Sequence, residues 1–352
     1  MRDISKIETQ YFLSGNAPIL YPADTLFCLL FIDTEKVLEL PKRYPYKGEW
    51  GKPLSTHLLE HESYPIPKTI DLVWLSVVER KVYSLHTNLP SDKIFKLLTY
   101  GNTNKNKQII KHIIVGMAPN GGVAIWIHEN RKSFLAAWLC AETVPMDTSD
   151  MKSGINIDYL YDLYIKDDLH IKGNTERIGL PPRNLYNKYM QQFFYRYLPI
   201  YERFNTDKGK WQKYHEDETV PEFEFIEEAL FDGTHDKLHD DGLLKYHKAG
   251  KPKKLAIKWH IKKTEYVAYF WFEDERIREV FDKFYGAHPD TKTDFIIRID
   301  TENKKYELAL YRYGLKEPQV IPEDVYQLLV FKNKFEDYRS DNYNQERGAW
   351  IW

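Results

Sequence analysis

The sequence predicts an α+β protein of two lobes, each an antiparallel sheet with helices packed on one of its faces. Apolar and polar residues alternate in several short segments, which is the period of a half-buried strand. Two other segments repeat their apolar residues at intervals of three and four, as amphipathic helices do. At 352 residues, the chain is longer than a single core usually serves, so two lobes are expected.

The clearest succession of elements lies near the C-terminus. Alternation over residues 255–261 and 266–272 predicts two strands. A helical stripe follows, made of Ile277, Val280, Phe281 and Phe284. Gly286 has the residue type that commonly ends a helix. A second alternating hairpin over residues 295–310 completes a unit of the order ββαββ.

An earlier part of the chain has a similar order. Strands are predicted at residues 71–77 and 82–86, and a helix opens after Pro90. Three more strands are expected at residues 112–115, 123–127 and 134–139. The shared order suggests an internal structural repeat, although residue identity between the two parts is too low to establish a duplication.

The region between these parts changes in composition. Residues 186–204 are rich in Tyr, Phe and Leu and are expected to form a helix. Residues 216–241 hold eleven acidic side chains and one lysine, whereas residues 242–264 hold eight lysines and no acid. This inversion of charge predicts an acidic junction at 206–245, which divides an N-terminal α+β domain (1–205) from a C-terminal ββαββ domain (246–352).

Overall composition narrows the classes of function. The net charge of −2 gives no global basic field for nucleic acid or an anionic membrane. Cys28 and Cys140 are too few for a disulfide framework. No stretch is long and apolar enough to span a membrane. The first residues lack the apolar core of a signal peptide, so we expect a cytoplasmic protein. A periplasmic or lipoprotein location stays open if an export signal has been removed.

Two histidine patterns have the spacing of metal ligands. His57, Glu60 and His61 match the H-x-x-E-H pattern of inverted zinc peptidases. Prolines close this window on both sides, and no third ligand has a distinctive spacing. His235 and His239 form a second pair, which we interpret as part of a solvated acidic loop or helix end. Apart from these two patterns, no group of residues has the types and spacing of a catalytic site. The sequence therefore indicates a protein that is not an enzyme and needs no metal or cofactor.

Residues 70–83 (IDLVWLSVVERKVY) and 115–126 (VGMAPNGGVAIW) carry a family resemblance. The chain resembles an uncharacterised bacterial family of Bacteroidetes, domain of unknown function twenty-nine thirty-one. The resemblance covers the first two-thirds best, and the C-terminal unit looks like the extension of longer members. Its motifs are structural and imply no catalytic residue. Such families often lie beside interbacterial toxin and type VI secretion genes, which implies an immunity or accessory role.

The sequence therefore predicts a non-catalytic binding protein, an immunity protein that binds and neutralises a cognate toxin. The alternative is a metal-dependent hydrolase that uses His57, Glu60 and His61. Segregated charge speeds association and rejects wrong partners, so the acidic segment is the expected partner-binding surface. The candidate residues are Glu216, Asp217, Glu218, Glu222, Glu224, Glu227 and Glu228. The C-terminal Trp350 and Trp352 are expected to pack against the second lobe.

Overall fold

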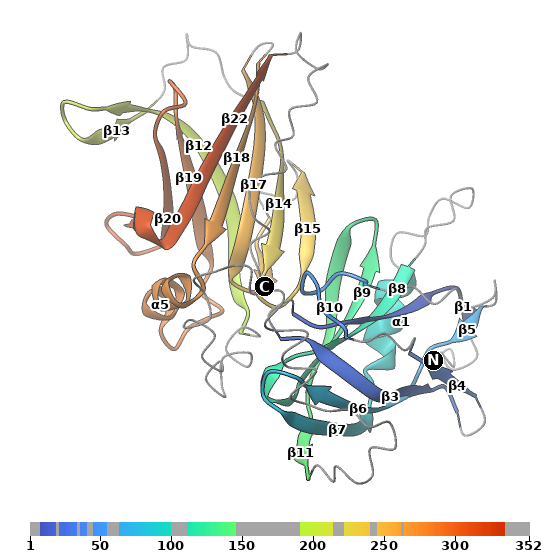
Figure 1. The fold of residues 1–352 in the computed structure, drawn as a ribbon. Coiled ribbons are helices and arrows are strands. Elements are labelled where there is room, and N and C mark those ends of the chain that lie inside the picture. The colour runs from blue at the N-terminus through green and yellow to red at the C-terminus, as the bar shows by residue number, and fades with distance from the viewer. Residues whose placement is uncertain are drawn as a thin grey trace. The chain divides into compact units, whose positions relative to one another are not determined.

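The computed structural model describes residues 8–18, 21–33, 36–40, 45–54, 63–99, 111–145, 191–213, 222–239, 245–261 and 264–334. Within these residues strands dominate and two α-helices occur (Figure 1). The prediction of α+β lobes with helices packed on one sheet face is therefore wrong, because the protein is mostly β. None of the helices in the described ranges is long and apolar enough to cross a membrane.

The chain divides into two compact units. Among the described residues, the first unit comprises residues 8–145 and 232–234, and the second comprises 191–231 and 235–334. The acidic stretch expected to join two domains instead carries three strands, and the second unit already begins at Gln191. The tail with Trp350 and Trp352 lies outside the described residues.

The first unit contains, in chain order, β1 (Glu8–Thr9), β2 (Phe12–Asn16), β3 (Ala23–Phe31), β4 (Val37–Glu39), β5 (Tyr64–Pro65), β6 (Thr69–Ser76), β7 (Lys81–Asn88), α1 (Ser91–Thr99), β8 (Lys111–Met117), β9 (Gly122–Glu129), β10 (Lys132–Cys140) and β11 (Glu142–Val144). One sheet has the order β11-β7-β6-β3-β4, and β2, β8, β9 and β10 are neighbours in another. Buried side chains from both sheets and from α1 form one hydrophobic core.

The second unit contains, in chain order, β12 (Phe193–Asn205), β13 (Lys210–Gln212), β14 (Glu222–Leu230), β15 (His235–His239), β16 (His247–Ala249), β17 (Pro252–Ile261), β18 (Thr264–Phe272), α5 (Asp274–Tyr285), β19 (Thr293–Asp300), β20 (Tyr306–Arg312), β21 (Gln319–Val320) and β22 (Tyr326–Lys334). Strands β15, β14, β17, β18 and β22 are neighbours in one sheet, and the other has the order β13-β12-β19-β20-β21. Phe272 and Phe295, from different sheets, meet in an edge-on ring contact in the interior.

The two units have the same strand topology. The first unit's β2, β3, β4, β6, β7, α1, β8, β9, β10 and β11 correspond in order to β12, β14, β15, β17, β18, α5, β19, β20, β21 and β22. Each unit pairs its first long strand in parallel with the strand that follows its helix, β2 with β8 and β12 with β19. All the other corresponding pairs are antiparallel. The internal structural repeat suggested by the sequence is thus present in the fold.

A tryptophan and a tyrosine stack across the strands at the same place in each unit. Trp74 pairs with Tyr83 between β6 and β7, and their ring centroids lie 5.2 Å apart. Trp259 pairs with Tyr266 between β17 and β18, at 5.5 Å. Both tryptophans lie two residues before the end of their strand and are fully buried. Superposing these two Trp–Tyr pairs gives the residue-by-residue correspondence between the two units.

Two finer features follow the same alignment. A β-bulge interrupts the pairing next to the partner of each tryptophan, after Thr25 in β3 and after Phe223 in β14. The hydroxyl of Tyr11 donates to the backbone oxygen of Pro65 (2.8 Å). The hydroxyl of Tyr195 donates to that of Gly250 (2.9 Å), at the equivalent place. Shared topology, bulges and hydrogen bonds make the units two copies of one fold.

The predicted hairpins and helices exist, but their assembly differs from the expected ββαββ sheet. In each unit the hairpin before the helix lies in one sheet, the next three strands after the helix lie in the other, and the last strand returns to the sheet of the hairpin (Figure 1). The helix therefore connects a hairpin of one sheet to a strand of the other. Gly286, at φ +56°, ends α5 as predicted.

The helix predicted over residues 186–204 is also wrong where the structure describes it, because β12 occupies Phe193–Asn205. Phe193, Tyr195 and Tyr197 are fully buried at alternate positions, which is the period of a strand. The spacing of Phe193 and Tyr197 also fits a helix, so the sequence permitted both periods. Aromatic residues favour strands, and the sheet decided between them.

Candidate functional site

The expected acidic binding residues have three different placements. Glu216, Asp217 and Glu218 lie outside the described residues. Glu222 begins β14, and only its backbone is described. The remaining three, Glu224, Glu227 and Glu228, follow on the same strand. The expectation that the whole segment is exposed is wrong for Glu228 and its neighbours up to His235, most of which are buried.

Glu224 faces basic residues of the neighbouring strand. Its carboxylate lies 2.9 Å from Nδ1 of His260 and 3.0 Å from Nζ of Lys258, both on β17. Glu265 on β18 contacts the same ammonium at 2.6 Å. Burial lowers the pKa of Lys258, but hydrogen bonds to Glu265 and Glu224 outweigh it and raise the pKa. Glu224 of the acidic segment thus pairs with Lys258 and His260 of the basic segment across adjacent strands.

Glu228 points into the core and is only 6% exposed. The Tyr197 hydroxyl donates to its carboxylate at 2.7 Å, and His247 Nε2 lies 3.9 Å away. Burial, and then the Glu228 charge, raise the pKa of Tyr197. The first unit has Leu13 and Leu30 at the positions of Tyr197 and Glu228. Glu227 is the most exposed of the three and lies 3.8 Å from Lys237.

Removing this buried pair gives a testable prediction. We expect Glu228→Leu alone to destabilise the protein by about 1–3 kcal/mol, because the Tyr197 hydroxyl loses its acceptor. Tyr197→Phe with Glu228→Leu should recover most of that loss, since a buried pair replaced by apolar groups is often tolerated. Urea unfolding of the three proteins measures the difference. A double variant no more stable than the single one would contradict this account.

The histidine patterns provide no described metal site. His57, Glu60 and His61 lie outside the described residues. His235 and His239 occupy the two ends of β15, a strand, and not the expected loop or helix end. Residues four apart on a strand are about 13 Å apart, too far for one metal ion. In the described part of the chain, no three His, Cys, Asp or Glu side chains gather in a metal-binding arrangement.

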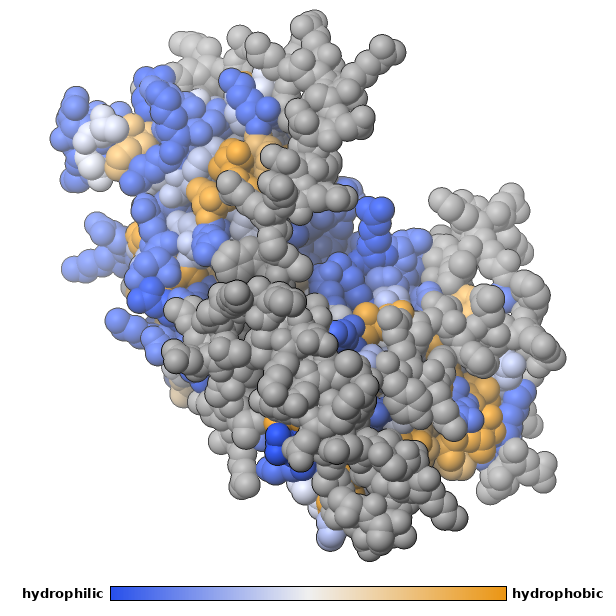
Figure 2. Space-filling model, in the orientation of Figure 1, coloured by the Kyte–Doolittle hydropathy of each residue, from blue (hydrophilic) through white to orange (hydrophobic). Residues whose placement is uncertain are grey.

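A group of aromatic rings lies on the outward side of β18 and β22. We call Tyr269, Trp271 and Phe331, together with Lys254, the aromatic face. Tyr269 stacks on Trp271 with ring centroids 5.5 Å apart, and Phe331 meets Tyr269 edge-on at 5.9 Å. The Lys254 ammonium lies 5.1 Å from the centre of the Tyr269 ring. Phe331 is 46% exposed, and Figure 2 shows apolar residues on the surface over β22.

The first unit is polar at the same place. Its residues equivalent to Tyr269 and Trp271 are His86 and Asn88, which pair with Asp71 and Thr69 on β6. Both are exposed. Packing within the fold therefore does not require aromatic side chains at these positions. The aromatic face is a property of the second unit alone and is the best candidate for a binding surface in the described residues.

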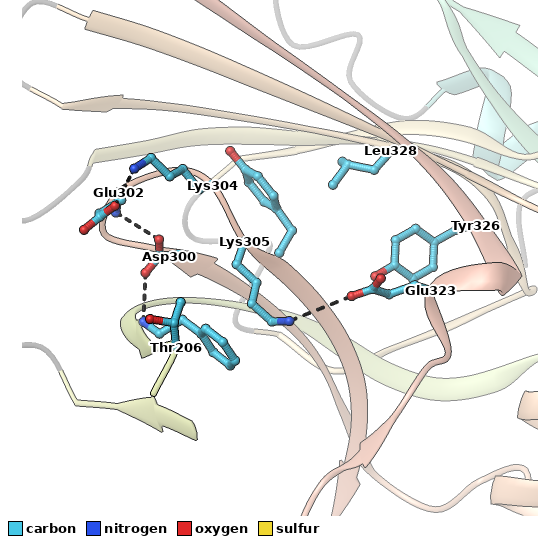
Figure 3. Close-up of a pocket in the computed structure, with 10 residues that line it drawn as sticks. Thr206, Asp300, Glu302, Lys304, Lys305, Glu323, Tyr326 and Leu328 are labelled. Carbon is cyan, nitrogen blue, oxygen red and sulfur yellow. Dashed lines mark hydrogen bonds and ion pairs between the residues drawn. The ribbon is translucent and has the colours of Figure 1, made fainter. Parts of the chain in front are cut away.

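The other side of β22 borders a groove. The groove has a volume of about 700 Å³ and is lined by Phe204, Lys305, Tyr306, Glu323, Tyr326 and Leu328, among others. Figure 3 shows Lys305 directed at Glu323, with 3.9 Å between the charged atoms. Lys304 likewise pairs with Glu302 (2.8 Å). Burial raises the pKa of Tyr326 to about 12, so its hydroxyl stays protonated at neutral pH.

Sequence reasoning missed both surfaces. The alternation of Tyr266, Ala268, Phe270 and Phe272 identified the inner face of β18, and the aromatic residues between them were not assigned a role. A strand with large aromatic residues on both faces was the available signal, because a solvated face normally carries polar residues. No sequence pattern predicted the groove, because the groove is formed where the chain crosses from one sheet to the other before β22.

Comparisons with known proteins add one finding. Neither the curated proteins nor the solved structures include a match to this chain. Residues 8–177 match the model of a family described as "Protein of unknown function (DUF2931)". This match spans the described strands of the first unit and stops before β12. The N-terminal part of the chain is therefore similar to this family and carries a domain of unknown function.

Proposed function

We propose that this protein acts by binding a partner protein and performs no chemistry of its own. The observation that carries the proposal is the aromatic face of the second unit. Tyr, Trp and Phe are enriched at protein interfaces, and Trp and Tyr are frequent hot-spot residues. The stacked rings are already held in place by one another, so little side-chain freedom is lost when a partner covers them.

The partner in this proposal is a toxin, and the protein is its immunity protein. This more specific proposal is motivated by the family resemblance, which implies genes for interbacterial toxins and type VI secretion nearby. A stoichiometric inhibitor needs a complementary surface and no catalytic group, and the aromatic face provides such a surface. The alternative of a metal-dependent hydrolase at His57, Glu60 and His61 gains no support from the described residues. One tightly bound metal ion per purified chain would favour it.

The test replaces the aromatic face by the residues of the first unit. We expect Tyr269→His, Trp271→Asn and Phe331→Glu together to weaken binding of the partner from the native host at least about 100-fold, since hot-spot residues each contribute about 2 kcal/mol or more. Calorimetric titration of the purified pair measures the affinity. The first two residues are those of the equivalent positions in β7, so the variant should fold.

Tyr313→Ser is the matched control, because Tyr313 is fully exposed and lies outside the aromatic face. It should leave the affinity unchanged. An unaltered affinity in the triple variant would refute the role of the aromatic face. A toxin assay then addresses the finer step: the wild-type protein should abolish the partner's toxicity, and the triple variant should not. A partner without toxic activity would refute the immunity role alone.

A further inference from the structure

The two units differ at one strand next to the groove. In the first unit, β10 pairs with β9 along its whole length, from Lys132 to Cys140. In the second unit, the equivalent β21 has two residues and pairs only with Ala309 and Leu310 of β20. One more hydrogen bond, from the Ile321 amide to the Leu308 oxygen (2.8 Å), continues the pairing. The next residue on that side would be Glu323, which instead begins a short 3₁₀ turn, so the pairing stops there.

The edge of β20 is therefore left without a strand where its hairpin begins. The Leu308 oxygen points toward β21, so the backbone groups of Tyr306, two residues earlier, point to the same side. No strand within the described ranges pairs with that edge at Lys305–Glu307. The groove lies here, between Tyr306 and the inner side of β22 with Tyr326 and Leu328.

The first unit shows what fits at this place. Its Leu139 pairs with Val123, the position equivalent to Tyr306. Leu139 and its neighbours Ala137 and Ala141 pack against the hydrophobic core. The second unit has no such residues because its chain crosses to β22 early, through the short 3₁₀ turn Glu323–Val325. The groove is the space that an extended apolar segment occupies in the other copy.

The charges around the groove point to the same kind of occupant. Lys304 is paired with Glu302, and Lys305 faces Glu323. The remaining charged group of the lining, the Asp300 carboxylate, accepts hydrogen bonds from the amides of Phe204 and Glu302. The rim therefore gives no preference for a strongly acidic or basic ligand. The walls are aromatic and aliphatic, with Leu328 36% exposed. A neutral segment with apolar residues at alternate positions complements both the walls and the open backbone edge.

We propose that the groove binds an extended apolar segment of the partner protein, which adds to the edge of β20 as a short antiparallel strand. The added strand takes the place that Trp138–Cys140 takes in the first unit. Backbone hydrogen bonds to Tyr306 hold it, and one apolar side chain enters between Tyr306, Tyr326 and Leu328. This is β-strand addition to an open sheet edge. The inference rests on the proposed function in taking the occupant to be part of a protein.

The chain itself supplies the probe. We expect a labelled synthetic peptide with the sequence of residues 136–142, carrying Cys140→Ser against oxidation, to bind the full-length protein with a Kd in the micromolar range. Fluorescence anisotropy measures the affinity. The same peptide with Leu139→Pro loses the central amide hydrogen and the leucine side chain, so it should bind at least about tenfold more weakly. Hydrogen exchange at the Tyr306 amide should slow when the first peptide binds.

Variants of the protein locate the binding. Leu328→Lys places a charge in the groove and should abolish peptide binding, whereas Leu329→Lys, on the opposite side of the same strand, should leave it intact. The triple variant of the aromatic face should also bind the peptide normally, so this result is independent of the proposed function. Equal binding of both peptides, unchanged binding by Leu328→Lys, or no binding at millimolar peptide would each overturn the proposal.

Discussion

Trp259→Ala is expected to lower the free energy of unfolding of the second unit by about 3–5 kcal/mol, the range for deleting a buried tryptophan side chain. The indole is fully buried. It stacks on Tyr266 across the sheet, and its Nε1 donates to Oδ1 of Asn303 at 3.2 Å. The substitution removes the ring contact and the hydrogen bond and leaves a cavity. Chemical unfolding combined with hydrogen exchange measures the loss and shows where it falls.

The repeat supplies the matched variant. Trp74→Ala removes the equivalent indole and should cost a similar free energy, with faster exchange confined to the first unit. Trp259→Phe keeps a ring for stacking and should cost less than the alanine variant. A loss below about 1 kcal/mol in either alanine variant, well under the usual range for a buried tryptophan, would show that these positions are not equivalent core sites.

Asp24→Asn should stabilise the protein at neutral and alkaline pH. The Asp24 side chain on β3 is 1% exposed, and its Oδ1 has no hydrogen-bond partner within the described ranges. Burial raises its pKa from 3.8 to about 7. The folded state thus holds a proton that the unfolded state has lost, and stability falls as the pH rises from about 4 to about 7. The difference of about three pKa units corresponds to about 4 kcal/mol as an upper value.

An asparagine at this position carries no charge to bury, so the variant should lack this part of the pH dependence. Urea unfolding between about pH 5 and about pH 8 compares the two proteins. The gain should be smaller at the acidic end and largest at the alkaline end. Asp274 also has a pKa raised to about 7 by burial, so the wild-type slope should be only partly removed. Identical slopes for both proteins would contradict the assignment to Asp24.

The sequence predicts local structure better than it predicts assembly. Strands and turns with clear alternation, such as residues 255–261 and the hairpin over 295–310, form as expected because their period is a local property. Which sheet a hairpin joins depends on strands far away in the sequence. The strand β3 has few polar residues to mark its two faces, and only its pairing with β6 identifies it. The fold class was wrong for this reason.

The candidate site shows the same division. The sequence reveals that acids cluster before lysines, but only the pairing of β14 with β17 shows that Glu224 and Lys258 meet. The groove depends on a comparison between β10 and β21, which the low identity of the copies hides from the sequence. The aromatic face needed the register of β18 with β22 to bring Tyr269 and Phe331 together.

The two equivalent bulges carry a consequence for how the copies diverged. A strand that slips by one residue turns its whole buried side toward water, so a bulge cannot move along the strand without rebuilding the core. The first copy has Leu30 where the second has Glu228, yet both bulges directly follow the residue that pairs with a tryptophan. If the copies share an ancestor, strand alignment was inherited more strictly than side-chain chemistry. Within this shared alignment, the first copy keeps β10 paired along β9, whereas the second copy has only the short β21 beside β20 and a groove next to it.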